Sequence, residues 1–235
     1  MIHMNSIQNN NAAIVDAAIT SRRSVRAFRK DPVSLDVVGA ILEVASRAPS
    51  SANMQPWRVY VVTGEARQRL VDVACRAYDN EPDQHVSELQ YYPSTMFEPY
   101  LSRRRKMGLA LYSLLGLKKE DKEGMRLQQR RNLQFFDAPV GMLFTMHRDL
   151  TDASLIDYGA FIGNIMTAAR ARGLDTCNVG AWSAYHRVVG PELKLTPQEL
   201  LLGGMALGYE DTEALVSQLR TDRLPLSEFV TFLTD

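Results

Sequence analysis

A group of arginines near the start of this 235-residue chain could bind a phosphate. The chain has 21 Arg but only 6 Lys, and a guanidinium group offers a rigid fork of donors that fits phosphate and carboxylate oxygens. Arg22, Arg23, Ser24 and Arg26 stand close together at the end of an expected helix, where Arg22 and Arg26 share one side if the turn stays helical. Such a group can hold a phosphate through charge-assisted hydrogen bonds, although a solvated basic helix end would give the same pattern.

A polar loop between two prolines is the second segment that could contact a ligand. Residues 48–57 read APSSANMQPW and stand between an apolar helical pattern and an apolar strand pattern, a setting in which ligand contacts concentrate. Ser50, Ser51, Asn53 and Gln55 supply donors and acceptors suited to the polar edge of a flat heterocycle. An ordinary capping turn is the alternative, but a turn needs fewer amide and hydroxyl side chains than these four.

Two shorter segments late in the chain complete the candidates. The first comprises Asn178, Val179, Gly180 and Ala181. Its small residues would let the backbone approach a ring closely and donate N–H groups to it, unless the segment is a plain strand end. The second holds Arg220 and Arg223 on either side of a turn, where they could bind a phosphate or be simple surface charge.

No pattern for metal, nucleotide-loop or triad chemistry is present. The four histidines have no ligand spacing, and the sequence lacks a G-x-S-x-G elbow, a Walker A loop and a GxGxxG turn. A cofactor would therefore carry out the chemistry of an enzyme built on this chain. The net charge of zero argues against a nucleic-acid-binding or polybasic membrane-binding protein, and no apolar run is long enough to span a bilayer. Cys75 and Cys177 lie far apart and outside any CxxC pair, and the N-terminus has no signal pattern. Together these features predict a cytoplasmic protein.

Apolar periodicity predicts the elements that position these segments. Expected helices cover residues 11–21, 35–48 with Ser34 as N-cap, 65–78, 103–117, 121–136 and 154–173; expected strands cover 57–64, 138–146 and about 204–208, with 174–182 a strand or loop. A helix start is expected just after Pro197. In the helix at 154–173 we expect a small-residue stripe for close packing: Ile156, Gly159, Ala160, Ile162, Gly163, Met166 and Ala169.

The chain has no internal domain boundary. Residues 1–11 are polar and Asn-rich, and we expect a flexible tail. Residues 12–235 then form one domain with an insertion at about 79–130, which would form a lid, and residues 224–233 suit an extended arm or a short strand. Tyr91 and Phe97 of the insertion are candidate substrate contacts.

Four segments resemble the flavin-dependent nitroreductase family in their order and separation: SRRSVRAF, RAPSSANMQPW, GLDTCNVGAW and LRTDRLPLSEF. The stretches EPYLSRRRKMGLALYSLLG and RRNLQFFDAPVG are similar to its nitrobenzoate-reductase-like branch. The resemblance implies an α+β fold, with a mixed central sheet flanked by helices. It also implies a homodimer with an extended C-terminal arm and one FMN at each end of the dimer interface.

By this resemblance, Arg22 and Arg23, with Ser24, match the segment that contacts the phosphate or ribityl chain, and Arg26 faces the pyrimidine edge of the flavin ring. The residues that match the loop lent by the second subunit are Pro49, Ser50, Ser51, Asn53 and Gln55. Residues 178–181 match the segment over the ring, and Arg223, with Arg220, matches a C-terminal phosphate clamp. Two positions depart from the family: Asn178 replaces the usual Pro, and Ser217 replaces an Asn. A further contact could come from Arg131, Asn132 or Gln134.

The residues and the resemblance together predict an FMN-dependent oxidoreductase. It would use NADPH or NADH to reduce nitroaromatic or quinone-like acceptors in a ping-pong hydride-transfer cycle, with no catalytic side chain beyond electrostatic support from Arg26. The alternatives are another activity of the family, such as reductive dehalogenation, enone reduction or dehydrogenation, and a non-catalytic flavin-binding protein. We expect the protein to bind a second copy of itself and a small aromatic acceptor, and we expect no metal site.

Overall fold

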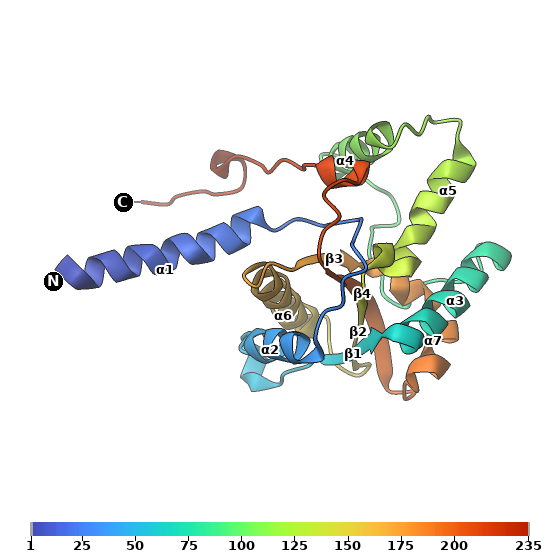
Figure 1. The fold of residues 1–235 in the computed structure, drawn as a ribbon, viewed down its shortest axis with the longest axis horizontal. Coiled ribbons are helices and arrows are strands. Elements are labelled where there is room, and N and C mark those ends of the chain that lie inside the picture. Colours follow the sequence, from blue (N-terminus) through green and yellow to red (C-terminus); the bar gives the residue numbers. More distant parts are fainter. Residues whose placement is uncertain (1, 235) are drawn as a thin grey trace.

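The centre of the molecule is a four-stranded antiparallel sheet, seen in a computed structural model that describes residues 2–234 and the side chains from residue 10 onward (Figure 1). The strand order is β1-β2-β4-β3. The strands are β1 (Arg58–Thr63), β2 (Val140–His147), β3 (Asp175–Val179) and β4 (Glu199–Gly208). Nearly all residues of the central pair, β2 and β4, are buried, as the continuous apolar pattern at residues 138–146 predicts.

The helices are α1 (Ile2–Ser21), α2 (Leu35–Ala45), α3 (Gly64–Asn80), α4 (Tyr100–Leu114), α5 (Lys122–Arg130), α6 (Ala153–Arg170) and α7 (His186–Leu193). Of these, α2 and α6 pack against one face of the sheet, and α3 and α7 pack against the other. Phe161 of α6 belongs to one hydrophobic cluster with Met142 of β2, and α2 contributes to the same cluster. Leu70 of α3 belongs to a second cluster with Leu143 of β2 and with residues of α7. Because successive side chains of a strand point to opposite faces, β2 contributes to both clusters.

The edge strand β3 is paired on its outer side by the residues that follow α1. Ser24 forms a parallel bridge with Thr176, and the Val25 N–H donates to the Thr176 carbonyl at 3.0 Å. This parallel pairing is an isolated bridge outside the four strands, which pair antiparallel throughout. Phe28 then forms an antiparallel bridge with Glu210, so the segment after α1 is held against the end of β4 as well.

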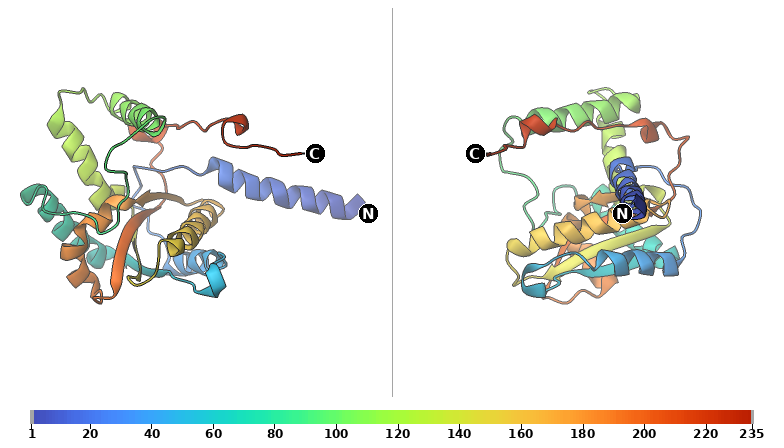
Figure 2. Two further views of the ribbon diagram at one scale, coloured as in Figure 1. Left: turned by 180° about the vertical axis from the view of Figure 1, so that it is seen from behind. Right: turned by 90° about the vertical axis from the view of Figure 1, so that its left-hand side faces the viewer.

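The first helix is longer than predicted. It begins at Ile2, so residues 2–11, predicted as a flexible tail, are helical. The stretch contains neither Gly nor Pro, and nothing in it interrupts a helix. Ile14, Val15 and Ile19 are each more than half exposed, because α1 extends away from the rest of the molecule (Figures 1 and 2).

The C-terminal segment extends from the same side of the molecule as α1 (Figure 2). It contains a 3₁₀ turn at Leu226–Glu228 and no strand within the described residues. The alternative of a short strand at residues 224–233 is therefore wrong, and the extended arm stays a prediction. Phe229, Phe232 and Leu233 are 65%, 74% and 93% exposed. Chain ends that leave such large apolar side chains in water point to a surface that another molecule covers.

The small-residue stripe of α6 is divided between the interior and the surface: Ala169 is buried and Ile162 and Met166 pack against the cluster that holds Met142, whereas Ile156 is 78% exposed. Tyr158, Phe161 and Ile165 of α6 are buried as well. One further prediction about the helices is wrong. No helix starts after Pro197 in the described structure; α7 lies earlier, where Pro191 inside the helix hides the helical pattern.

The expected insertion forms a loop followed by α4 and α5. The loop covers residues 81–99, and α4 has no buried residue. The structure also divides the helix predicted at 121–136 into α5 and a 3₁₀ turn, Arg131–Asp137. These elements lie at one end of the molecule, beside the path of the C-terminal segment.

Candidate functional site

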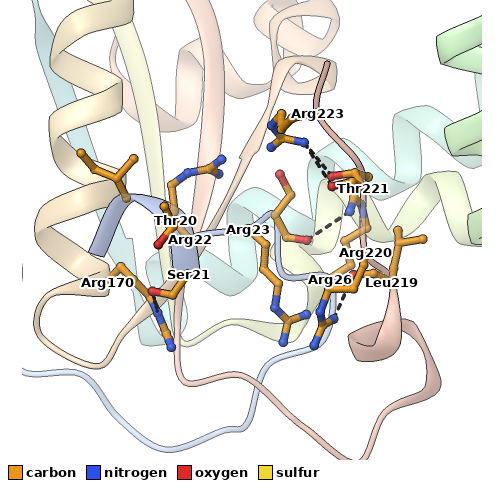
Figure 3. A pocket seen from close by; sticks show the side chains of 12 residues that line it. Thr20, Ser21, Arg22, Arg23, Arg26, Arg170, Leu219, Arg220, Thr221 and Arg223 are labelled. Carbon is orange, nitrogen blue, oxygen red and sulfur yellow. Dashed lines mark hydrogen bonds between the residues drawn. The ribbon is translucent and has the colours of Figure 1, made fainter. Parts of the chain in front are cut away.

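A pocket of about 800 Å³ lies where α1 ends, between the residues after this helix and residues 219–223 (Figure 3). Two segments nearly 200 positions apart in sequence therefore meet in one place. Six arginines line the pocket: Arg22, Arg23, Arg26, Arg170, Arg220 and Arg223. The two arginine groups that the sequence singled out thus form a single site.

Backbone contacts explain why the two segments meet. The bridge between Ser24 and Thr176 fixes the first segment on β3. The Ser217 carbonyl accepts a hydrogen bond from Arg23 Nη1 and another from Arg220 Nη1, each at 2.8 Å. Ser217 is itself buried, and its hydroxyl donates to the Asp211 carbonyl at 2.6 Å. This one residue therefore joins both arginine groups, a role that its replacement of the family's usual Asn did not suggest.

Four of the arginines have no carboxylate partner among the described side chains. Arg26 donates to the Ser24 carbonyl at 3.1 Å, and Arg223 donates to Thr221 Oγ1 at 3.0 Å and the Asp222 carbonyl at 2.8 Å. Arg220 contacts only backbone carbonyls, and Arg22 forms no ion pair within the described part of the chain. Guanidinium groups concentrated in one pocket without counter-ions have the chemistry to bind an anion, and their geometry suits a phosphate.

Two arginines of the pocket are already paired. Arg23 forms an ion pair with Glu210, whose side chain is only 10% exposed, and Arg170 pairs with Asp175 at 3.0 Å while donating to Ser21 Oγ at 3.0 Å. The structure thus gives Arg23 a role in holding the pocket together, besides the phosphate contact that the resemblance assigns. Sequence reasoning missed Arg170 and Glu210, because nothing in their local sequence distinguishes them from ordinary surface charges.

The segment at residues 178–181 covers the end of β3 and the start of the 3₁₀ turn that follows it. Asn178 and Ala181 are exposed, whereas Val179 is buried. A side chain at Gly180 would stand 2.8 Å from the Tyr91 ring, so the absence of a Cβ lets this ring from the insertion lie on the segment. Gly203 of β4, with φ of 151°, faces the Tyr91 hydroxyl in the same way. The structure therefore brings Tyr91 to the backbone that was predicted to lie over the flavin ring.

The polar loop at residues 49–55 is not part of the arginine pocket. Its 3₁₀ turn, Ser51–Asn53, is anchored on α6 through the Ser51 N–H, which donates to Asp157 Oδ2 at 3.1 Å. The side chains of Ser51, Asn53 and Gln55 are exposed. Ala52, Asn53 and Gln55 have φ of 48°, 57° and 50°, a strained conformation of the kind that clusters at functional segments. An exposed, strained polar loop away from this chain's own pocket is suited to another molecule's site.

None of the three candidates for a further flavin contact, Arg131, Asn132 and Gln134, lines the arginine pocket. Arg131 pairs with Asp137 at 3.0 Å, and the Asn132 amide donates to the Gln129 carbonyl at 2.7 Å. Phe97, the other predicted substrate contact, lines a separate pocket in the insertion together with Tyr92 and Tyr100.

A buried carboxylate lies on the opposite part of the sheet and was not predicted. Glu199 Oε2 accepts from the Tyr60 hydroxyl at 2.7 Å and from Thr145 Oγ1 at 2.8 Å. Its Oε1 accepts from Arg58 and from the Thr196 N–H, both at 3.2 Å. Burial alone would raise the pKa of Glu199, but these hydrogen bonds and the Arg58 charge outweigh it and lower the pKa to about 2.

Comparison with known proteins identifies the fold and its relatives. The profile of the nitroreductase family matches residues 19–209. The chain belongs to the nitroreductase family. It is 44% identical to a chloronitrobenzene nitroreductase of Comamonas testosteroni, over 93% of this chain and 96% of the relative. It is 36% identical to a 4-nitrobenzoate reductase of Pseudomonas putida, over 93% and 95% of the two chains.

Solved nitroreductase structures have the same fold. NfnB of Sphigopyxis sp. strain HMH, described as FMN- and NADPH-dependent, has a TM-score of 0.91 at 33% identity and covers 94% of this chain and 99% of its own. FMN-dependent NfnB of Mycobacterium smegmatis, solved with NADPH, has a TM-score of 0.90 at 31% identity, over 95% and 99% of the two chains. The resemblance of the four sequence segments to nitroreductases is thus confirmed.

Two general findings complete the description. Within residues 2–234, none of the helices has the length and apolar character needed to cross a bilayer. The same residues contain no group of three His, Cys, Asp or Glu side chains placed to hold a metal ion.

Proposed function

We propose that this protein is an FMN-dependent oxidoreductase that uses NADPH or NADH to reduce nitroaromatic or quinone-like acceptors. The observation that carries the proposal is the pocket of about 800 Å³ in which four arginines lack a carboxylate partner among the described residues. Relatives named for chloronitrobenzene and 4-nitrobenzoate, and structures described as FMN- and NADPH-dependent, support the cofactors and the acceptor class.

The donors of the pocket fit FMN. Arg22, Arg220 and Arg223 would bind the phosphate, since each carries a guanidinium group without a counter-ion. Arg26 would stabilise negative charge at the N1 and C2=O edge of the ring. Gly180 and its neighbours would offer backbone N–H groups to the ring. Bound FMN would supply hydride acceptance and donation at N5, so this chain needs no side-chain acid, base or nucleophile.

We further propose that the working form is a homodimer, in which each subunit lends Pro49, Ser50, Ser51, Asn53 and Gln55 to the FMN of the other. The exposed apolar residues of α1, the exposed phenylalanines of the C-terminal segment and the exposed Ile156 of α6 support this arrangement. Residues of all three kinds would be buried between two copies of the chain. The polar loop, which lies outside its own subunit's pocket, would then reach the partner's.

The insertion would form a lid over the flavin, with Tyr91 and Phe97 contacting the acceptor. The packing of Tyr91 on Gly180 supports this role. We also propose a cytoplasmic location, since Cys75 and Cys177 are both free and buried, as expected for a protein from a reducing compartment.

Three measurements on the purified protein test the proposal. Acid extraction and chromatography should release FMN, and sedimentation should show a dimer. NADPH or NADH should bleach the flavin under anaerobic conditions, and a nitroaromatic or a quinone should restore its colour. Release of FAD would disprove the cofactor assignment. If neither NADPH nor NADH bleached the flavin, the protein would be a non-catalytic flavin-binding protein.

A further inference from the structure

We propose that Asp157 of α6 is a positioning residue for the flavin that the partner subunit holds. This inference rests on the proposed homodimer, in which the polar loop at residues 49–55 of one chain contacts the FMN of the other. Asp157 does not touch the flavin in this arrangement. It fixes the conformation in which the loop reaches across to the second subunit.

The loop between α2 and β1 contains three residues in a strained backbone conformation. Ala52, Asn53 and Gln55 have positive φ although none of them is glycine, and such residues persist where surrounding contacts fix them. Ser50 accepts two bonds from within the loop, at its hydroxyl oxygen from the Gln55 N–H and at its carbonyl from the Asn53 N–H, each at 3.0 Å. These bonds close the turn, but they do not fix its position relative to the rest of the molecule.

One side of α6 supplies the contacts that fix this position. The Asn164 amide donates to the Ala45 carbonyl at 3.3 Å, just before the loop begins. Phe161 stacks on Trp57, just after the loop ends, with ring centroids 4.8 Å apart and planes at 10°. Asp157, Phe161 and Asn164 are four and three positions apart, so they lie on the same side of the helix. The helix therefore holds the segment at its start, its middle and its end.

Asp157 holds the middle, where the flavin contacts are expected. Its Oδ2 accepts from the Ser51 N–H at 3.1 Å. Within the described part of the chain, no other side chain outside residues 50–55 forms a hydrogen bond with them. The side chains of Ser51 and Asn53 stay exposed. The carboxylate thus fixes the backbone of the loop and leaves its polar side chains available to another molecule.

The size of the effect follows from the loss of one partly exposed hydrogen bond. Without it, the strained residues can relax to negative φ, and FMN binding must then order the loop again. Net contributions of such bonds are modest, and water weakens a charged contact at the surface. We therefore expect the Kd for FMN to rise by roughly three- to tenfold when the carboxylate is removed.

The first test titrates FMN into flavin-free parent and variant proteins and follows flavin fluorescence. Asp157→Ala should raise the Kd by roughly three- to tenfold. Asp157→Asn should stay within about twofold of the parent, because an amide oxygen can also accept from the Ser51 N–H. Asp152→Ala removes a carboxylate that does not cap the same helix, and it should leave the Kd unchanged.

The second test uses a mixed dimer, in which one chain carries Asp157→Ala and the other carries Arg223→Ala. Two different affinity tags on the chains allow this dimer to be purified. If each loop serves the partner, one site combines an intact arginine pocket with an intact loop, and half of the sites should bind FMN with the parental Kd. If the loop serves its own subunit, each site carries one defect and neither has the parental Kd.

Three results would overturn the inference. A parental Kd for Asp157→Ala would show that other contacts hold the loop. Equal losses in Asp157→Ala and Asp157→Asn would show that the bond to the Ser51 N–H is not the cause. A mixed dimer without a parental site would place the effect of Asp157 in its own subunit. Failure of the proposed function differs from all three, because the parent itself would then bind no FMN or would bind it as a monomer, and the inference would fall with it.

Discussion

Replacing Glu199 with Gln should remove a contribution to stability that depends on pH in a defined way. The substitution keeps the size of the side chain and removes the charge that Tyr60, Thr145, Thr196 and Arg58 stabilise. The folded state lowers the pKa of this carboxyl from 4.5 to about 2. At about 1.4 kcal/mol for each pH unit between these values, the ionised carboxylate stabilises the fold by roughly 3 kcal/mol at pH 7.

The sign of the pH dependence follows from the lowered pKa. The contribution is fully present above pH 4.5 and is lost as the pH falls toward 2, because the unfolded chain then binds the proton first. Linkage with these two pKa values leaves about 1.5 kcal/mol at pH 3. The difference in unfolding free energy between parent and Glu199→Gln should therefore shrink by about half between pH 7 and pH 3.

Urea unfolding at fixed protein concentration, followed by circular dichroism at several pH values, measures this difference. Effects of acid that are the same in parent and variant cancel in this difference in unfolding free energy. Any destabilisation by the Gln amide that does not depend on pH shifts the difference by a constant and leaves its pH dependence unchanged. Glu120→Gln, at an exposed glutamate without an ion pair in the described part of the chain, should give a difference near zero throughout. A Glu199→Gln difference that stays constant between pH 7 and pH 3 would refute the reasoning.

Three further predictions concern the flavin site. Arg223→Ala should weaken FMN binding roughly ten- to a hundredfold, the cost of one charge-assisted contact, and fluorescence titration should show this while the rate per bound flavin stays unchanged. Arg26→Ala should instead make FMN harder to reduce and slow its reduction by NADPH or NADH by a similar factor. Stopped-flow measurement on FMN-saturated protein tests this, and a rate equal to that of the parent would show that another group stabilises the negative charge of the reduced ring. Gly180→Ala should displace Tyr91 and raise the KM for the acceptor, because the new Cβ would lie 2.8 Å from the Tyr91 ring. In a chain that already carries Tyr91→Ala, Gly180→Ala should cause no further rise in KM, whereas additive effects would mean that the two residues do not interact.

Local sequence was sufficient where one element determines the outcome. Ser34 begins α2 as predicted, and its hydroxyl oxygen accepts from the Asp36 N–H at 3.2 Å. Gly173, predicted to end α6, has φ of 73° and closes that helix. The two arginine groups were also recognised from spacing and residue type, and they do line one pocket.

Contacts between distant residues could not be predicted in the same way. Glu210 pairs with Arg23 across 187 positions, and Tyr60 meets Glu199 across 139, so neither pair leaves a local pattern. The stripe on α6 is divided between interior and surface: Ala169 is buried in this chain's core, whereas Ile156 is 78% exposed. Periodicity alone does not say which residues of such a stripe the chain itself covers.

The arginine pocket is built from segments docked on the edge of the folded core. Residues 22–26 follow a projecting helix and are held on β3 by the bridge between Ser24 and Thr176. Residues 217–223 precede the C-terminal segment and are held to the first segment through the Ser217 carbonyl, which accepts from Arg23. Such peripheral segments open at a lower free energy than the central strands. Capture and release of the anion can therefore proceed through local fraying while the sheet stays intact. Ligand binding should accordingly slow amide hydrogen exchange most strongly in these two segments and least in β2.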